Sequence, residues 1–162
     1  MRRAIEHFAA GNWPEEQAAD SLTLMFDDRH RRRIRLASDA GQPILLDLPK
    51  AVAMADGDGL YCDDGRWLAV RAATENLVEI QCGDARTLAR VAWHLGNRHL
   101  PTQLHGTTIR IRPDHVIEDM VRGLGAQIRF IAAPFQPEGG AYESEGAHPH
   151  HHHHDHGHSH AH

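Results

Sequence analysis

Cysteine is scarce in this sequence and long apolar runs are missing. The chain has two cysteines in 162 residues, Cys62 and Cys82, twenty positions apart. That spacing matches neither a Cys-x-x-Cys pair nor a zinc finger, so it predicts reduced, partly buried thiols and no thiolate metal site. No stretch approaches the ~18 apolar residues of a membrane span, and no apolar segment follows Met1 as in a secretory signal. We therefore expect a cytoplasmic protein that does not contact membranes.

Motifs of the common enzyme classes are missing as well. The sequence contains no nucleophile elbow, Walker loop or Rossmann fingerprint. Residues 56–60 begin like a calcium loop, but Leu60 and Trp67 occupy its fifth and twelfth positions, where oxygen ligands are needed. A metal-dependent hydrolase using His94, His99 and His115 would lack a candidate general base beside those ligands. The sequence therefore does not predict an enzyme.

Histidine is what the chain has in excess. Ten of its sixteen histidines lie within residues 148–162: His148, His150, His151, His152, His153, His154, His156, His158, His160 and His162. Neutral imidazole suits Ni, Cu and Zn, so a dense tract of this kind predicts metal binding. At two to four imidazoles per ion, the tract would hold about two to five ions.

The composition of the histidine tract also indicates its origin and its order. A purification tag is usually an uninterrupted run, whereas here other residues alternate with the last histidines: Asp155, Gly157, Ser159 and Ala161. Alternation favours an evolved metal-binding tract over a tag appended to a protein-interaction module. Polar rings separated by glycine and proline bury too little apolar surface to offset the ordering entropy, so we expect residues 142–162 to be disordered without metal.

Two folded units precede the tail. In residues 1–73, short apolar runs alternate with turn signals, which is typical of small antiparallel strands. The expected strands span residues 21–26, 33–37, 44–48 and 67–71. Turns are expected at Asp39 to Gly41, Asp56 to Gly59 and Asp63 to Gly65, where aspartate and glycine cluster. This region is predicted to be a small all-β domain.

Residues 74–141 change periodicity and predict a second domain. We expect a strand over 76–82, a helix over 84–95, strands over 100–104 and 107–112, a helix over 114–123 and a strand over 127–132. Asp84 is suited to cap the first helix and Gly96 to end it. The β-α-β-β-α-β order is typical of a ferredoxin-like fold, in which two helices cover one face of the sheet. The fold class is therefore α+β.

Two histidines lie near the predicted end of the first helix. His94 falls in its last turn, where a packing or dipole-compensating role is more common than metal ligation. His99 lies five residues further on, beyond a glycine, so the two do not share the i, i+4 geometry of a preformed ligand pair. In a two-fold dimer, however, a residue near the axis meets its own copy. One exposed histidine can then supply two ligands to one ion.

Three segments carry a resemblance to a known family. His94-Leu-Gly-Asn-Arg-His99-Leu-Pro, Pro113-Asp-His115-Val-Ile-Glu-Asp-Met120 and residues 134–142, followed by the histidine-rich tail, closely resemble the UreE family of urease accessory proteins. The resemblance implies a homodimer with a peptide-binding-like β domain and a ferredoxin-like metal-binding domain. It implies that His99 and its symmetry mate hold Ni(II) at the dimer interface, with tail histidines completing the shell or holding further ions.

The same resemblance implies the role of the protein. A nickel metallochaperone of this kind delivers its ion to the urease apoprotein complex through a UreG-type GTPase accessory protein. His115 matches a peripheral metal-binding histidine of some members, although Pro113 stands where those members carry a second histidine. Zn(II) or Cu(II) is expected to bind the same imidazoles. An alternative is a general Ni/Cu/Zn storage or buffering protein with no delivery partner.

Residues 29–35 form a basic run with four arginines besides Arg29 and one histidine. The run has no interleaved aromatic residues and the chain carries a formal charge of −5, so a nucleic-acid surface is not expected. A solvated hairpin or a docking surface for an acidic partner fits the pattern better.

Overall fold

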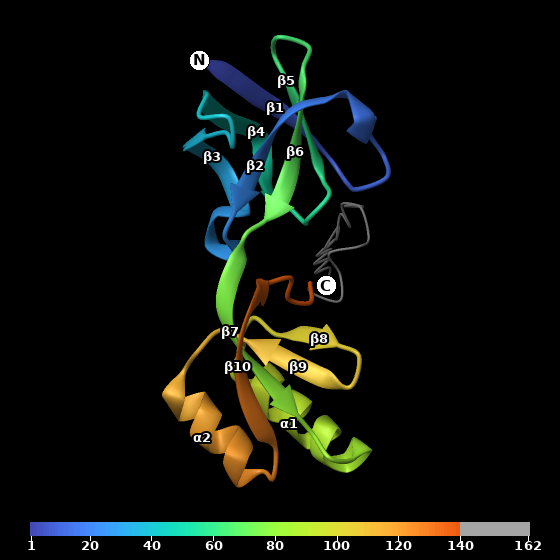
Figure 1. The fold of residues 1–162 in the computed structure, drawn as a ribbon, viewed down its shortest axis with the longest axis vertical. Coiled ribbons are helices and arrows are strands. Elements are labelled where there is room, and N and C mark those ends of the chain that lie inside the picture. Colours follow the sequence, from blue (N-terminus) through green and yellow to red (C-terminus); the bar gives the residue numbers. More distant parts are fainter. Residues whose placement is uncertain (140–162) are drawn as a thin grey trace, which may run out of the picture.

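The computed structural model describes residues 1–139, which form two domains placed end to end (Figure 1). The first domain contains the strands β1 (Arg2–Phe8), β2 (Ala18–Leu24), β3 (His30–Ala37), β4 (Pro43–Ala53), β5 (Gly59–Cys62) and β6 (Trp67–Ala72). Two 3₁₀ turns, η1 (Glu15–Gln17) and η2 (Phe26–Asp28), lie beside β2 in the chain. The predicted all-β character is confirmed.

One sheet of order β2-β6-β5-β1-β4-β3 makes up the first domain. The expectation of purely antiparallel strands is wrong, because β1 pairs with β4 and β2 pairs with β6 in parallel. Antiparallel pairing is imposed by tight hairpins, and neither of these pairs is joined by one. The sheet encloses an apolar core that includes Leu22, Ile44, Leu46, Leu60 and Leu68, all fully buried.

Two strands of this domain were not expected from the sequence. In β1 only Ala4 is fully buried, so no apolar alternation marks the strand. The four residues of β5 lie between two Asp-Gly turns and are too few to show a period. The turns themselves are confirmed, since Gly41, Gly57 and Gly65 adopt the positive φ that favours glycine.

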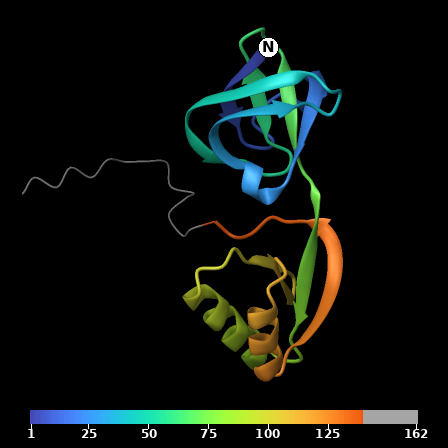
Figure 2. The ribbon, with the colours of Figure 1, turned by 90° about the vertical axis from the view of Figure 1, so that its left-hand side faces the viewer.

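The second domain contains β7 (Thr74–Gln81), α1 (Ala85–Asn97), β8 (Gln103–His105), β9 (Thr108–Ile111), α2 (His115–Gly123) and β10 (Gln127–Pro134). The predicted β-α-β-β-α-β order is confirmed, and the four strands form a sheet of order β10-β7-β9-β8 with antiparallel pairs throughout. Figure 2 shows both helices on one side of this sheet. Their buried residues, Val91, Leu95, Ile117 and Val121, pack against Val78, Ile80, Ile109 and Ile111.

Most of the capping residues and element boundaries predicted for the second domain agree with the structure. Asp84 caps α1 by accepting a hydrogen bond from the Thr87 amide at 2.7 Å, as predicted. The strand expected over residues 100–104 instead begins at Gln103, because Pro101 has no amide hydrogen for a ladder. In residues 1–139 no helix is long and apolar enough to cross a membrane.

A short junction joins the domains. Only Ala73 separates β6 from β7, and β10 pairs with β7 along its whole length, from Gln127 with Gln81 to Pro134 with Thr74. The η2 turn of the first domain reaches this ladder: the Phe26 amide donates to Glu75 at 2.8 Å, and the Phe26 ring packs edge-on against Phe135 at 5.3 Å. The junction fixes the two walls of the cleft described below.

Candidate metal-binding site

His99 stands immediately beyond the end of α1. The predicted stop at Gly96 is wrong: the helix runs through this glycine to Asn97, and Arg98 is the C-cap. His99 is the next residue, the position at which many helices place a glycine with positive φ. Its amide donates to the Gly96 carbonyl at 3.1 Å, which satisfies one of the last carbonyls of the helix.

The backbone of His99 is unusual. Its φ is 53°, and it is the one non-glycine residue of the described chain with a positive φ. Histidine enters this left-handed region more readily than most residues, but a side chain there is disfavoured by about 1–2 kcal/mol compared with glycine. The conformation turns the chain sharply at the helix end, and the His99 side chain is exposed.

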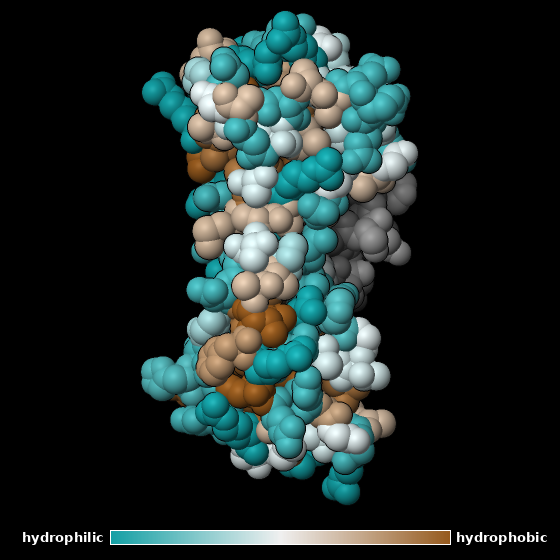
Figure 3. All heavy atoms as spheres, in the orientation of Figure 1, coloured by the Kyte–Doolittle hydropathy of each residue, from teal (hydrophilic) through white to brown (hydrophobic). Residues whose placement is uncertain are grey.

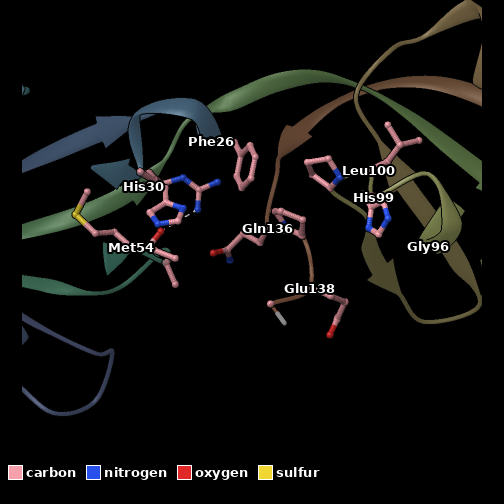
Figure 4. Close-up of a pocket in the computed structure, with 14 residues that line it drawn as sticks. Phe26, His30, Met54, Gly96, His99, Leu100, Gln136 and Glu138 are labelled. Carbon is pink, nitrogen blue, oxygen red and sulfur yellow. Dashed lines mark hydrogen bonds between the residues drawn. The ribbon is translucent and has the colours of Figure 1, made fainter. Parts of the chain in front are cut away.

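A cleft of about 690 Å³ lies between His99 and the first domain. Gly96, His99 and Leu100 line one side of it, and Phe26, His30 and Met54 line the other (Figure 4). Residues 136–139 contribute Gln136 and Glu138 between these two walls. Sequence reasoning did not identify His30, Gln136 or Glu138 as neighbours of His99, because they come from segments far apart in the chain.

Hydrogen bonds fix the segment that follows β10 along this cleft. The Gln136 amide donates to the Gln103 side chain at 3.1 Å, and the Gln136 side-chain oxygen accepts from the Asp56 amide of the first domain at 2.9 Å. The Glu138 amide donates to the Thr102 carbonyl at 2.8 Å. Glu138, near the end of the described residues, is therefore bonded to Thr102, which follows His99 by three positions in the sequence.

Arg29 stabilises the same junction from inside. It is 4% exposed and donates hydrogen bonds to the Phe135 carbonyl and, at 3.3 Å, to the Met54 carbonyl. Its guanidinium lies over the Phe26 ring, and its Nε has no hydrogen-bond partner among the described residues. Burial lowers the pKa of Arg29, against the attraction of Glu75. The interpretation of the whole basic run as solvated therefore fails at Arg29.

The other predicted histidines lie apart from this cleft or outside the description. His94 is half-buried in the last turn of α1, with its ring 5.0 Å from the Trp93 ring, as expected of a packing residue. His115 is the exposed first residue of α2 and does not line the cleft. Ten predicted ligands lie outside the described residues: His148, His150, His151, His152, His153, His154, His156, His158, His160 and His162.

Three further candidate metal ligands, Asp58, Cys62 and Cys82, are not available to an ion. Asp58 accepts hydrogen bonds from the Ala10 and Ala55 amides and pairs with His7 at 2.6 Å, so its carboxylate is used internally. Burial raises the pKa of the Cys62 thiol to about 11 and also raises that of Cys82. Neither thiol is poised to act as a thiolate ligand.

No three histidine, cysteine, aspartate or glutamate side chains within residues 1–139 are grouped so that they could hold a metal ion. His99 therefore presents one exposed imidazole at the edge of a cleft without a preformed ligand shell. An ion bound there would need further ligands from outside this part of the chain. A second copy and residues after Gly139 are the two available sources.

Comparisons with known proteins agree across both domains. Residues 2–73 match the family model described as UreE urease accessory protein, N-terminal domain, and residues 75–162 match its C-terminal domain. The urease accessory protein UreE of Bradyrhizobium sp. (strain ORS 278) is 54% identical over 149 residues, covering 91% of this chain and 70% of the relative. That of Rhodopseudomonas palustris (strain BisB18) is 57% identical over 142 residues, covering 88% and 67%. That of Agrobacterium fabrum is 44% identical over 148 residues, covering 91% of each.

Proposed function

The chain belongs to the UreE family of urease accessory proteins, and on that premise we propose that it is a nickel metallochaperone. It binds Ni(II) and delivers the ion to the urease apoprotein complex in the cytoplasm, through a UreG-type GTPase. The working unit is a homodimer of two-domain protomers. Its ligands are His99 at the interface, the histidines of the tail and, at the periphery, His115.

The observation that carries this proposal is the isolated presentation of His99. The chain places an imidazole in a strained backbone conformation at the end of a helix and leaves it exposed. Strain of this kind persists where the surroundings enforce it and is concentrated at functional sites. A two-fold axis beside His99 would bring its copy to the same ion, which supplies a second imidazole without any other residue of the domain.

Exposed apolar side chains support dimerisation through the second domain. Six large hydrophobic residues are exposed among the described residues, and four belong to this domain: Trp93, Leu104, Val116 and Phe130. Most of the strongly apolar surface visible in Figure 3 also lies over the second domain. Trp93 is 65% exposed on α1, six residues before His99. A large exposed aromatic side chain is typical of interface anchors.

The Glu138–Thr102 hydrogen bond supports a role for the tail at His99. From Gly139 to His148 the chain has nine residues, which span at most about 30 Å when fully extended. This length allows His148 to reach His99, and a short tether gives an effective concentration in the millimolar range. Imidazoles that arrive separately also leave separately, so an ion can pass to an acceptor by stepwise ligand exchange.

Selectivity for nickel does not come from affinity alone. Copper binds imidazole sites more tightly than nickel on the Irving–Williams order, and zinc also binds them. Supply of the ion and recognition by the urease assembly would decide which metal is delivered. A general Ni/Cu/Zn storage protein would have the same tail but would not need His99 for urease activation.

Urease activation with purified components tests the proposal. The intact protein, its His99→Ala variant and a His105→Ala control would each be loaded with nickel and added to urease apoprotein with its accessory proteins. His105 is an exposed histidine of β8, so the control removes one imidazole from the same domain. We expect His99→Ala to reduce the rate of activation at least tenfold and His105→Ala to leave it unchanged. Equal activation by all three would favour the storage function.

A further inference from the structure

The basic run outside Arg29 forms an open edge of the first sheet. Strand β3 is the last strand in the order β2-β6-β5-β1-β4-β3 and pairs with β4 alone. Its first residue, His30, lines the cleft, and the strand continues from there along one side of the first domain (Figure 1). An edge strand has a row of backbone N–H and C=O groups that no neighbouring strand uses. This edge is therefore available for another strand.

Side chains of β3 divide between the two faces of the sheet. Ile34 and Leu36 pack against the core, opposite Leu46 and Ile44 of β4. Arg33 and Arg35 alternate with them and lie on the outer face, opposite Asp47 and Leu45. Between Arg31 and Arg33 the register shifts, because β4 has four residues, 48–51, opposite the single residue Arg32. Arg31, Arg32, Arg33 and Arg35 are all exposed.

The four exposed arginines of this edge outnumber the acidic side chains that pair with them. Arg31 is 3.7 Å from Asp28 and Arg33 is 3.8 Å from Asp47, while Asp47 also accepts a 2.7 Å hydrogen bond from Arg3. Among the described residues Arg32 and Arg35 form no ion pair. The pKa of Asp47 lies below its ordinary value, chiefly because of the Arg3 hydrogen bond, with Arg33 and Arg32 contributing. The two acids therefore leave a net positive edge.

We propose that the open edge of β3 binds an extended, acidic segment of a partner protein. The segment adds as a further strand, and its carboxylates pair with the four exposed arginines of β3: Arg31, Arg32, Arg33 and Arg35. Strand addition supplies backbone hydrogen bonds, and alternate side chains supply specificity. Arginine suits this role because its planar guanidinium binds carboxylates through two parallel hydrogen bonds.

Overall composition does not account for the charge of this edge. The chain has a formal charge of −5, yet these four arginines lie within five consecutive residues. Charge on an edge strand also prevents sheet-to-sheet aggregation, but a charge of either sign serves that purpose. Charge complementarity with a partner requires the positive sign and raises the association rate. Reversing the charge of the edge therefore distinguishes binding of an acidic partner from protection against aggregation.

Association with the urease assembly tests this inference, which depends on the proposed function for its choice of partner. The probe is purified urease apoprotein complex carrying its accessory proteins, added to the intact metal-free protein. Arg32→Glu/Arg35→Glu reverses the edge but keeps it charged, and Arg32→Lys/Arg35→Lys keeps its sign. Arg86→Glu/Arg122→Glu is the matched control, with the same charge change at exposed positions of α1 and α2.

We expect Arg32→Glu/Arg35→Glu to weaken this association at least tenfold at about 0.05 M salt, with a smaller difference at about 0.5 M, where screening shortens the range of the charges. The lysine pair and the matched control should bind as the unaltered protein does. Amide hydrogens of β3 should exchange more slowly in the complex. Nickel binding should be the same in all variants.

Four results would overturn the inference. Equal binding of the glutamate pair and the unaltered protein would show that the arginines only protect the edge. If the glutamate pair loses binding, but the complex of the unaltered protein shows no slower amide exchange in β3, strand addition is excluded. Binding of a 20-nucleotide oligodeoxythymidylate that is lost in the glutamate pair would identify a nucleic-acid surface instead. If the unaltered protein itself fails to bind the assembly, the delivery function fails together with this inference, whereas the first three results leave that function standing.

Discussion

The amide of Glu138 donates a 2.8 Å hydrogen bond to the carbonyl of Thr102. This bond joins the segment that leads into the histidine-rich tail to the loop that begins at His99. It therefore fixes Glu138, four residues before Tyr142, in the cleft that His99 lines. Tail and helix end act together in the proposed transfer of nickel.

Replacement of His99 should separate metal binding from backbone strain. The positive φ of 53° disfavours any side chain at this position, so His99→Gly should be more stable than His99→Ala by about 0.5–1 kcal/mol. Both variants should lose the interface ion. Urea unfolding of the two metal-free proteins measures the difference, and a more stable alanine variant would contradict the role of the left-handed conformation.

Trp93→Ala should weaken the dimer without removing His99. Loss of an exposed aromatic anchor at an interface typically reduces affinity by 2 kcal/mol or more, about a thirtyfold change. Met25→Ala is the control, because Met25 is 53% exposed in the first domain. Sedimentation over a range of protein concentrations measures the dissociation constant. An unchanged constant for Trp93→Ala would place the interface elsewhere.

Arg29 and Arg33 belong to one basic run but should differ in their effect on stability. Arg29→Ala removes a buried guanidinium that bonds two carbonyls, so we expect a loss of about 2–3 kcal/mol in the free energy of unfolding. Arg33 is exposed and its ion pair with Asp47 is long, so Arg33→Ala should cost less than about 0.5 kcal/mol. Similar losses for the two variants would contradict the assignment of Arg29 to the domain junction.

Glu79 should make stability depend on pH. Burial by itself would raise the pKa of this carboxyl, but hydrogen bonds from Arg110 at 3.1 Å and Arg129 at 2.6 Å outweigh it and hold the pKa below the ordinary value. A depressed pKa in the folded state stabilises the protein above the unfolded-state pKa, near 4.3, and that stability is lost as the pH falls through the folded-state pKa.

Glu79→Gln tests this dependence directly. The variant keeps the shape of the side chain but loses the charge, so it should be less stable by about 1.5–3 kcal/mol at pH 7, the usual worth of hydrogen bonds to a charged group. The gap should narrow as the pH falls below about 4. Thermal unfolding between pH 3 and pH 7 measures it, and a gap that does not change with pH would exclude the charge as its source.

The sequence predicted those parts of the fold that depend on local signals. Asp84 caps α1 as expected, and the helix stripes containing Val91, Leu95 and Val121 form the core of the second domain. Strand β1 was missed because its pairing with β4 is non-local and its side chains show no alternation. The end of α1 was misplaced because the left-handed position belongs to a histidine and not to Gly96.

In the candidate site, too, the sequence predicted what a local motif encodes and missed what depends on contacts between distant segments. His99 was predicted as a ligand from its place in a motif; the structure shows that its side chain is exposed just beyond α1. The cleft, the position of His30 and the burial of Arg29 were not identified, because they arise where two domains and the segment after β10 meet. No local pattern in the sequence encodes such a meeting. It depends on contacts such as Phe26 with Phe135, 109 positions apart.

The most direct test of the central claim is a nickel titration by calorimetry of the intact chain and of a chain ending at Tyr142, with the mass of each species determined in parallel. We expect the shortened protein to remain a dimer and to keep one tight ion per two chains, while the intact chain binds about two to five additional ions per protomer. Loss of all nickel binding with the tail would contradict the site at His99 and would leave storage by the tail as the function.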